Sequence, residues 1–450
     1  MPKLQFKTQN LKNTSILIIA KLLSYIIKFL NLGAGSTWPG EVILRLNKSF
    51  IKEIVNSNNF KAIIIAGTNG KTTTSTMIKY LLNNEDKRVF QNEEGANLLN
   101  GIASAIIKNS GWLGKLNYDY GVFEVDENTL PLVLNEINPY IIVLLNLFRD
   151  QLDRYGEVNT IALNWREGLK NLKKDTNLIL NADDPLVASL GENIAAKVEY
   201  FTIDQKMMKV EEHTHDVDSI YCPRCQTKLN YQLIAYSHLG KYLCPNCGFK
   251  NPKSDFSPQN LKNSQLKGLY NMYNINAAIL LLNKILKINF EKINHVLGKF
   301  KPAFGRQEEI SYLGKKILFQ LSKNPAGFNQ SISVVKELAQ KEKINLLMVL
   351  NDRIPDGRDV SWIWDVDLEN IKDLPRYKKR LMRIVVSGDR CYDMGLRLKY
   401  AEMRYEREEN LSKALKRIVE IAKKKEKIVI LATYTGILDL RKIILGKKLL

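Results

Sequence analysis

Short apolar runs alternate with longer stretches of helical periodicity along most of this chain. The first run covers residues 62–65, and similar runs follow at 120–125, 140–145 and 178–180. Apolar runs of this length, separated by helical stretches, are typical of βα units whose parallel strands are buried on both faces. The pattern therefore predicts a mainly parallel sheet in the first half of the chain.

The second half resumes this alternation after an interruption. A polar, cysteine-bearing stretch around 211–255 is followed by strong helical periodicity at 271–286 and by the hinge-like sequence Lys301-Pro-Ala-Phe-Gly-Arg306. Beyond it, further strand-like runs alternate with helical stretches, which predicts a second α/β domain. These later runs lie near 316–320, 345–350, 383–386 and 428–432.

The N-terminal apolar stretch at 15–30 carries Lys21 and Lys28, so it is too short and too charged to cross a bilayer. Its apolar positions fit an amphipathic helix, and such helices more often pack on their own protein than on lipid. We expect a cytoplasmic protein in three parts. These are a helical segment at 1–60 packing on the next domain, a central domain at 61–300 with a module inserted at about 219–252, and a C-terminal domain at 301–450.

A loop of glycine, lysine and threonine follows the first apolar run directly. Residues 66–74 read Ala-Gly-Thr-Asn-Gly-Lys-Thr-Thr-Thr, and a helical pattern begins near Ser75. This order leaves backbone N–H groups free at a helix N-terminus, where they bind phosphate. We predict an ATP site in which Lys71 neutralises phosphate charge and Thr72 reaches Mg²⁺. The predicted nucleotide-binding residues of this loop are Gly67, Thr68, Asn69, Gly70, Lys71, Thr72 and Thr73.

Four of the five cysteines form two Cys-x-x-Cys pairs separated by eighteen residues. Four thiolates at this spacing close a tetrahedral site with no open position, which is typical of a structural zinc ribbon. A redox dithiol does not account for two matched pairs. We expect three nearby histidines to be surface residues and the fifth cysteine to be a packed thiol. The predicted zinc ligands are Cys222, Cys225, Cys244 and Cys247, the histidines are His213, His215 and His238, and the fifth cysteine is Cys391.

Composition indicates a folded protein larger than one hydrophobic core supports, since 450 residues are 45% apolar and 25% charged. The formal net charge of +20 suits an acidic ligand, a nucleic acid or an anionic membrane, and equally a solvated basic surface. Charge alone does not decide among these.

Several motifs, taken in order, resemble those of the Mur ligases, ATP-dependent enzymes that join an amino group to a carboxylate in peptidoglycan assembly. The resemblance implies a Mur-ligase-like P-loop ATPase domain of α/β fold with an inserted four-cysteine zinc ribbon, followed by a Rossmann-like α/β C-terminal domain. The motifs are the phosphate loop, Phe123-Glu-Val-Asp126, Asn146-Leu-Phe-Arg-Asp-Gln-Leu-Asp-Arg-Tyr-Gly156, Asn181-Ala-Asp-Asp-Pro185, Gly268-Leu-Tyr-Asn-Met-Tyr-Asn-Ile-Asn-Ala-Ala278 and Gly305-Arg306.

The sequence departs from the usual Mur ligase motifs in two places, and these narrow the choice of branch within the family. Ligases of this family that add amino acids usually carry Asp-His-Leu-Asp where this chain has Asp150-Gln151-Leu152-Asp153, and a carbamylated lysine soon afterwards. No lysine lies between Glu157 and Leu169, which argues against amino-acid addition and leaves the family's second metal site open. The ribbon and the segments 321–327 and 351–365 are similar to one branch, the MurT-type synthetase subunits of lipid II isoglutaminyl synthase.

Resemblance to this branch implies that the chain uses ATP to convert the α-carboxylate of D-glutamate in the stem peptide into an acyl phosphate. Ammonia from a GatD-type glutamine amidotransferase partner then displaces phosphate and gives D-isoglutamine. The implied cofactors are ATP, Mg²⁺ and structural Zn²⁺. The implied substrate is lipid II or a related muropeptide, which brings the protein to the inner face of the cytoplasmic membrane and involves no nucleic acid.

The same resemblance assigns roles to individual residues. It implies that Glu124 binds Mg²⁺ with Thr72, that Asn271 contacts adenine and that Arg306 contacts the phosphates; Asp359 would complete the Cys-His pair of the partner. Glu124 has independent support, because open α/β sheets place functional groups at the carboxyl ends of strands. The catalytic residues expected are Lys71, Glu124 and Asp359.

Plainer alternatives accompany these roles. Asn271 and Asn274 suit helix N-caps. Asp359 lies in a Gly- and Pro-bearing loop where aspartates usually make turns, and the loop tryptophans either anchor it or belong to the core. The other loop residues concerned are Asp352, Asp356, Asp365, Trp362 and Trp364.

Two rival functions remain open from the sequence. One is a stand-alone Mur or folylpolyglutamate-type ligase that adds a whole amino acid, against which the absent lysine counts. The other is a nucleic-acid-binding NTPase whose ribbon and basic surface grip phosphates, which would show steeply salt-dependent binding.

Overall fold

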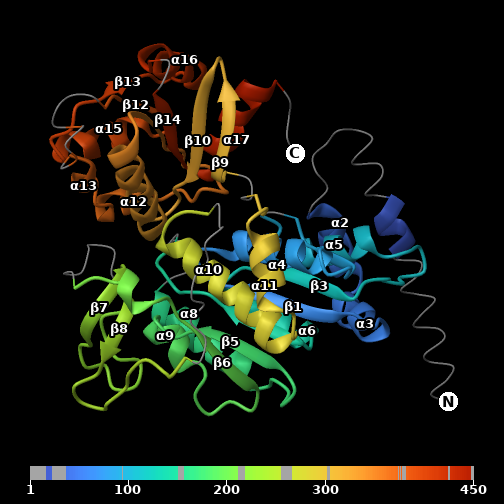
Figure 1. Ribbon diagram of the computed structural model, residues 1–450. Helices are drawn as coiled ribbons and strands as arrows, with labels where there is room; N and C mark the ends of the chain where they lie inside the picture. The colour runs from blue at the N-terminus through green and yellow to red at the C-terminus, as the bar shows by residue number, and fades with distance from the viewer. Residues whose placement is uncertain are drawn as a thin grey trace, which may run out of the picture.

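The computed structural model describes residues 17–22, 37–93, 95–150, 157–210, 218–254, 266–301, 305–372, 374, 377, 382–423 and 426–446. Within these ranges the chain forms two six-stranded sheets and a two-stranded hairpin. Figure 1 shows each large sheet among its own helices, with the hairpin of β7 (Asn230–Tyr236) and β8 (Leu239–Leu243) beside the first sheet. The α/β fold class predicted from the alternating apolar runs is confirmed.

The first sheet has the order β2-β3-β1-β4-β5-β6, and all of its neighbours pair in parallel. Alternate side chains of β1 enter two separate hydrophobic cores: Ile64 packs in one, while Ile63 and Ile65 pack in the other. Burial on both faces explains why these strands read as continuous apolar runs. The strands are β1 (Lys61–Ala66), β2 (Val89–Gln91), β3 (Tyr120–Val125), β4 (Ile141–Leu144), β5 (Asn177–Asn181) and β6 (Lys197–Phe201).

Helices cover both faces of this sheet. The first core takes residues from α2, α3, α5, α6, α8 and α9, and the second from α4, α10, η2 and α11. The helical residues 17–22 contribute Leu17 and Ala20 to the first core. The bounds are α2 (Trp38–Leu46), α3 (Phe50–Ser57), α4 (Lys71–Asn83), α5 (Leu99–Asn109), α6 (Leu130–Glu136), α8 (Val158–Leu169), α9 (Pro185–Ser189), α10 (Leu269–Ile279), the π-helix η2 (Leu280–Ile285) and α11 (Phe290–Leu297); a short 3-10 turn, η1 (Gln205–Met207), follows β6.

The second sheet has the order β13-β12-β11-β14-β10-β9, parallel except for the antiparallel pair β9–β10. Its strands alternate between two further cores in the same way, since Leu346 packs in one and Leu347 in the other. The elements are β9 (Arg306–Tyr312), β10 (Lys315–Leu321), α12 (Pro325–Lys341), β11 (Ile344–Val349), η3 (Ser361–Asp365), α13 (Glu369–Lys372), β12 (Ile384–Ser387), α15 (Cys391–Tyr400), β13 (Glu406–Arg407), α16 (Leu411–Ile421), β14 (Lys427–Ala432) and α17 (Tyr434–Leu445).

Two local expectations differ from the structure. The helix after the phosphate loop begins at Lys71 rather than near Ser75, because Gly70 takes a left-handed conformation (φ 95°) and turns the chain directly into the helix. Arg306 begins strand β9 rather than ending a hinge, and 302–304 lie outside the described residues. Among the described residues, no helix combines the length and apolar character needed to cross a membrane.

Candidate active site

A cavity of about 530 Å³ lies between the carboxyl ends of the two sheets. Its walls come from the phosphate loop, from the segments after β3 and β4, and from the segment after β10. Carboxyl ends of parallel strands are where open α/β sheets bind ligands. Besides residues 68–73, the lining includes Glu124, Glu127, Asp150, Tyr236, Arg306 and Lys323.

The phosphate loop is held by the segment that follows β4. The Thr68 hydroxyl accepts from the backbone N–H of Phe148 (3.0 Å), and the backbone N–H of Asn69 donates to Oδ1 of Asn146 (2.9 Å). A side chain at Gly70 would collide with Oδ1 of Asn274, since an added Cβ would lie 2.1 Å from that atom. The loop therefore needs a glycine here and is fixed in shape by its neighbours.

Lys71 is buried among carboxylates. Its Nζ donates to the backbone oxygens of Gly67 (2.5 Å) and Thr68 (3.2 Å) and lies 3.1 Å from Oε2 of Glu127. Burial alone would lower the pKa of Lys71, but the negative charges of Glu127 and of other nearby carboxylates outweigh it and raise that pKa. The ammonium group is therefore charged at neutral pH and available to a phosphate.

An oxygen-rich corner suited to a divalent cation lies beside this lysine. The Thr72 hydroxyl donates to Oε2 of Glu124 at 2.7 Å, and Oδ1 of Asp150 is buried with no hydrogen-bond partner among the described residues. Mg²⁺ prefers carboxylate and hydroxyl oxygens, and an orphaned carboxylate oxygen in a cavity is costly unless a ligand completes it. The residues present thus fit a hydrated magnesium ion.

The two sheets are joined across the cavity by polar contacts. Nζ of Lys323 lies 2.5 Å from Oδ2 of Asp150, and the side chains of Asn69 and Asn324 contact each other at 3.2 Å. The second sheet therefore supplies a cation and an amide directly at the phosphate loop.

Of the other residues predicted to bind the nucleotide, some line the cavity and others do not. Arg306 lines the cavity, whereas Asn271 and Gly67 are not among the described residues that line it. Nδ2 of Asn271 donates to the backbone oxygen of Lys267 (2.8 Å), and Asn274 lines the cavity in its place. The N-cap of α10 is Gly268, so the interpretation of the two asparagines as N-caps is wrong.

Asp359 lies outside the cavity lining, on an exposed turn between β11 and η3. Its carboxylate accepts from the backbone N–H (2.8 Å) and the hydroxyl (3.0 Å) of Ser361, the first residue of η3, and so makes a turn as its loop composition predicts. Trp362 packs against Phe328, while Trp364 is 46% exposed and is not core.

The four paired cysteines come together at the base of the hairpin formed by β7 (Asn230–Tyr236) and β8 (Leu239–Leu243). Their sulfur atoms all lie within 4.8 Å of one another, with 3.5 Å between Cys222 and Cys247 and 3.4 Å between Cys225 and Cys244. These separations exclude disulfides, whose S–S bonds are about 2.05 Å, and suit a central metal about 2.3 Å from each sulfur. Gly248 takes φ +72°, as the tight turn after the second pair requires.

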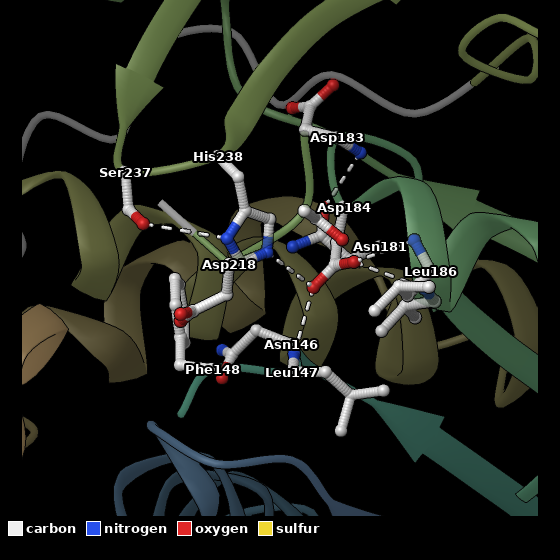
Figure 2. A network of polar contacts seen from close by, with 12 residues as sticks. Asn146, Leu147, Phe148, Asn181, Asp183, Asp184, Leu186, Asp218, Ser237 and His238 are labelled. Carbon is white, nitrogen blue, oxygen red and sulfur yellow. Dashed lines mark hydrogen bonds and ion pairs between the residues drawn. The ribbon is translucent and has the colours of Figure 1, made fainter. Parts of the chain in front are cut away.

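His238, at the tip of this hairpin, is fully buried in a polar network (Figure 2). Its Nε2 lies 3.4 Å from Oδ2 of Asp184, its Nδ1 lies 3.5 Å from Oγ of Ser237, and its ring packs on Phe148 at 4.8 Å. The order serine, histidine, carboxylate is that of a hydrolytic triad, but Ser237 is only 3% exposed. The group of Ser237, His238 and Asp184 therefore has a structural role, and we call it the structural lock. Its Asp184 also accepts from the backbone N–H of Leu147.

The prediction that the histidines are surface residues is consequently wrong for His238. The hairpin tip presses onto the end of β5, and Lys241 of β8 reaches Asp183 at 2.7 Å, so the histidine is covered. His213, His215 and the segment 151–156 with Gln151 lie outside the described residues. Cys391 is buried, as expected.

Several residues at the site escaped the sequence reasoning. Glu127 follows Glu124 by three residues at the same strand end, so its position carried a usable signal. Lys323 and Asp150 each lie in a noted motif, but 173 residues separate them and only the fold brings them together. Tyr236 gave no signal, because its place in the cavity wall depends on how the ribbon docks.

Comparisons with known proteins agree along the chain. A family profile described as the Mur ligase middle domain matches residues 65–282, and one described as MurT ligase C-terminal matches residues 321–437. The chain is 34% identical to "Lipid II isoglutaminyl synthase (glutamine-hydrolyzing) subunit MurT" of Staphylococcus aureus, over 82% of this chain and 84% of the relative. It is 31% identical to the protein of the same description from Streptococcus pneumoniae, over 98% of both chains.

Solved structures share the fold. A pseudomurein peptide ligase type C from Methanothermus fervidus matches with a TM-score of 0.63 and 23% identity, over 86% of this chain and 79% of the other. The MurF ligase of Thermotoga maritima in complex with ADP matches with a TM-score of 0.58 and 15% identity, over 90% of this chain and 83% of the other.

Proposed function

The chain belongs to the MurT branch of the Mur ligases and is an ATP-dependent ligase; on this premise we propose that it activates the α-carboxylate of D-glutamate in a peptidoglycan stem peptide for amidation. The observation that carries the proposal is the cavity in which Lys71, Thr72 and Glu124 meet Lys323 of the second domain. A phosphate loop that faces a second domain suits transfer of a phosphoryl group to an acceptor held between the two.

The reaction follows from the weakness of a carboxylate as an electrophile. A carboxylate oxygen attacks the γ-phosphorus of ATP, the bond to ADP breaks, and an acyl phosphate forms. Ammonia then attacks the acyl carbon and loses a proton, and inorganic phosphate leaves with the former carboxylate oxygen. Lys71 and the loop N–H groups hold the transferring phosphoryl group, and Lys323 is placed to offset charge on the acceptor side.

Metal ions are part of this proposal. Mg²⁺ bound near Thr72, Glu124 and Asp150 would neutralise charge on the phosphate oxygens. We propose Zn²⁺ for the cysteine cluster, where a closed thiolate set serves folding rather than chemistry. Arg306, which lines the cavity, and Asn271, beside Asn274 on α10, are proposed as phosphate and adenine contacts.

We further propose that ammonia comes from a GatD-type glutamine amidotransferase subunit. The relatives are described as glutamine-hydrolyzing and as subunits, which supports a partner. Asp359 is exposed on a turn outside the cavity, so its carboxylate is accessible to a histidine of that partner. The complex would act in the cytoplasm on lipid II or a related muropeptide, at the inner face of the membrane.

A reconstitution tests this proposal. The purified chain with the amidotransferase, ATP, glutamine and lipid II is expected to yield isoglutaminyl lipid II, measured as the carboxylate-to-amide mass change. The chain alone is expected to do the same with ammonium salts in place of glutamine. Asp359→Asn is expected to abolish the glutamine reaction and spare the ammonium reaction, and equal loss of both would remove Asp359 from the partner's triad.

The same assay decides the rivals. A stand-alone amino-acid ligase would incorporate a free amino acid without the partner, whereas this proposal expects none. A nucleic-acid-dependent NTPase would hydrolyse ATP faster with DNA or RNA. The buried docking of the ribbon through His238 and Lys241 gives no support to that function.

A further inference from the structure

Arg149 connects three parts of the molecule that are far apart in sequence. It lies in the segment after β4 that holds the phosphate loop. Its Nε lies 2.5 Å from Oδ1 of Asp218, in the segment that leads into the ribbon, and its backbone N–H donates to Oδ2 of the same residue (2.8 Å). Its Nη2 lies 3.5 Å from Oδ2 of Asp365, at the end of η3 in the second domain.

The Asp218 end of this connection is rigid. The Asp218 side chain is 4% exposed, and burial raises its pKa while His238 and Arg149 oppose that shift. Figure 2 shows Asp218 beside His238 and above Phe148, so the arginine is anchored to the same lock that braces the segment 146–150. Separating the two partners of a buried ion pair is strongly unfavourable. Asp218 therefore holds the Arg149 guanidinium in place.

The Asp365 end of this connection belongs to η3, the 3-10 helix that follows the turn of Asp359. Ser361 begins η3 and binds the Asp359 carboxylate, and Asp365 ends η3. The guanidinium of Arg397 donates to the backbone oxygens of Ile363 (3.2 Å) and Val366 (2.6 Å), which ties η3 together. Asp365 and the turn of Asp359 thus lie at opposite ends of one short helix that is held by hydrogen bonds.

We propose that Arg149 is a positioning residue that couples nucleotide occupancy of the phosphate loop to the Asp359 turn. The next residue, Asp150, faces the cavity and pairs with Lys323, so a bound nucleotide acts on the same short segment. This proposal rests on the proposed function, since it concerns the link between ATP binding and glutamine hydrolysis by the partner. Physically, the ion pair between Arg149 and Asp365 favours one position of η3 relative to the phosphate loop.

The test compares Asp365→Asn with Asp389→Asn. Both carboxylates are 40% exposed and paired with an arginine, but the partner of Asp389 is Arg353 of the same domain (2.7 Å). In the complex with the amidotransferase, Asp365→Asn is expected to lower the ratio of glutamine-dependent to ammonium-dependent amidation about fivefold, the low end of measured couplings, since the pair is partly solvated. Asp389→Asn is expected to leave the ratio unchanged. A ratio unchanged in Asp365→Asn would overturn the proposal.

Hydrogen exchange provides a readout that does not depend on amidation. A non-hydrolysable ATP analogue is expected to slow amide exchange at residues 357–366 in the parent and in Asp389→Asn, but not in Asp365→Asn. Arg149→Gln is expected to abolish this slowing as well, because it removes the same pair with Asp365 and, in addition, the pair with Asp218. Equal exchange with and without the analogue in the parent would refute the coupling, whereas failure of the parent to amidate with ammonium would refute the proposed function instead.

Discussion

The carboxyl ends of the two sheets border the same cavity, but their buried polar groups differ in charge. After β1, β3 and β4 the first sheet gathers Lys71, Glu124, Glu127 and Asp150, and in the part of the chain that the structure describes one oxygen of Asp150 has no hydrogen-bond partner. After β11 and β14 the second sheet buries an amide, a hydroxyl and one carboxylate that satisfy one another. Nδ2 of Asn351 donates to Oγ1 of Thr435 (2.9 Å), and both oxygens of Asp356 accept from the backbone N–H and the hydroxyl of Thr435.

This contrast indicates which sheet edge binds the ligand. Buried carboxylates in excess of cations are unfavourable unless a ligand of opposite charge completes them, and a metal-bound polyphosphate does so. The network of the second sheet contains one carboxylate, Asp356, and both of its oxygens have donors, so it needs no ligand and serves as a frame. The first sheet edge is therefore the reactive one, and the second holds the segments that carry Lys323 and Asp359 in place.

Removing the central cation tests the reactive edge most severely. Lys71→Ala is expected to lower kcat/KM for ATP-dependent amidation by about 10²- to 10³-fold, as loss of a preorganised charge donor does. The measurement is amidation with ammonium, with thermal unfolding recorded to check folding. Lys79→Ala, on the same helix but outside the described cavity lining, is the control and should stay near the parent. If Lys71→Ala amidated as fast as the parent, the first sheet edge would not be the reactive one.

Removing the metal tests whether the ribbon belongs to the frame. Cys244→Ser is expected to abolish stoichiometric zinc, measured by elemental analysis, and to lower the unfolding temperature, because binding free energy of a structural metal is folding free energy. Cys391→Ser should keep the full metal content, since Cys391 lies in another core. Retention of one zinc per chain in Cys244→Ser would refute the four-thiolate site.

A substitution in the Thr435 network tests whether the second sheet edge serves as a frame. Thr435→Val leaves Asp356 and Asn351 short of partners and is expected to cost about 1–3 kcal/mol of unfolding free energy, with amidation little changed. Thr160→Val, on an exposed helical position, should cost within about 0.5 kcal/mol. If Thr435→Val were as stable as the parent but much less active, the reactive groups would lie at the second sheet and not at the first.

The pH dependence of the same variant sharpens this point. Burial raises the pKa of Asp356, and the bonds from Thr435 oppose that shift. Losing one of them raises the folded-state pKa further, so the folded variant binds a proton more readily than the unfolded chain. Stability then falls as pH rises above the unfolded pKa of about 3.9. The stability deficit of Thr435→Val should therefore be larger at pH 7 than at pH 4, measured by denaturant unfolding.

The sequence predicted features whose signal is local. Continuous apolar runs predicted the buried parallel strands. The spacings of glycine, lysine and cysteine predicted the phosphate loop and the cluster of four cysteines. Edge strands such as β6 and β9 were missed because one side of each is solvated and their apolar pattern is weak. The burial of His238 and the pairing of Lys323 with Asp150 depend on docking between distant segments, which no local pattern encodes.

The central claim is that the first sheet edge transfers a phosphoryl group from ATP to a substrate carboxylate. The direct measurement uses lipid II whose D-glutamate α-carboxylate carries ¹⁸O, with ATP and ammonium, and mass analysis of the phosphate released. The account predicts that each phosphate formed with an amide carries one ¹⁸O atom from the substrate. Release of unlabelled phosphate alongside amide formation would contradict it.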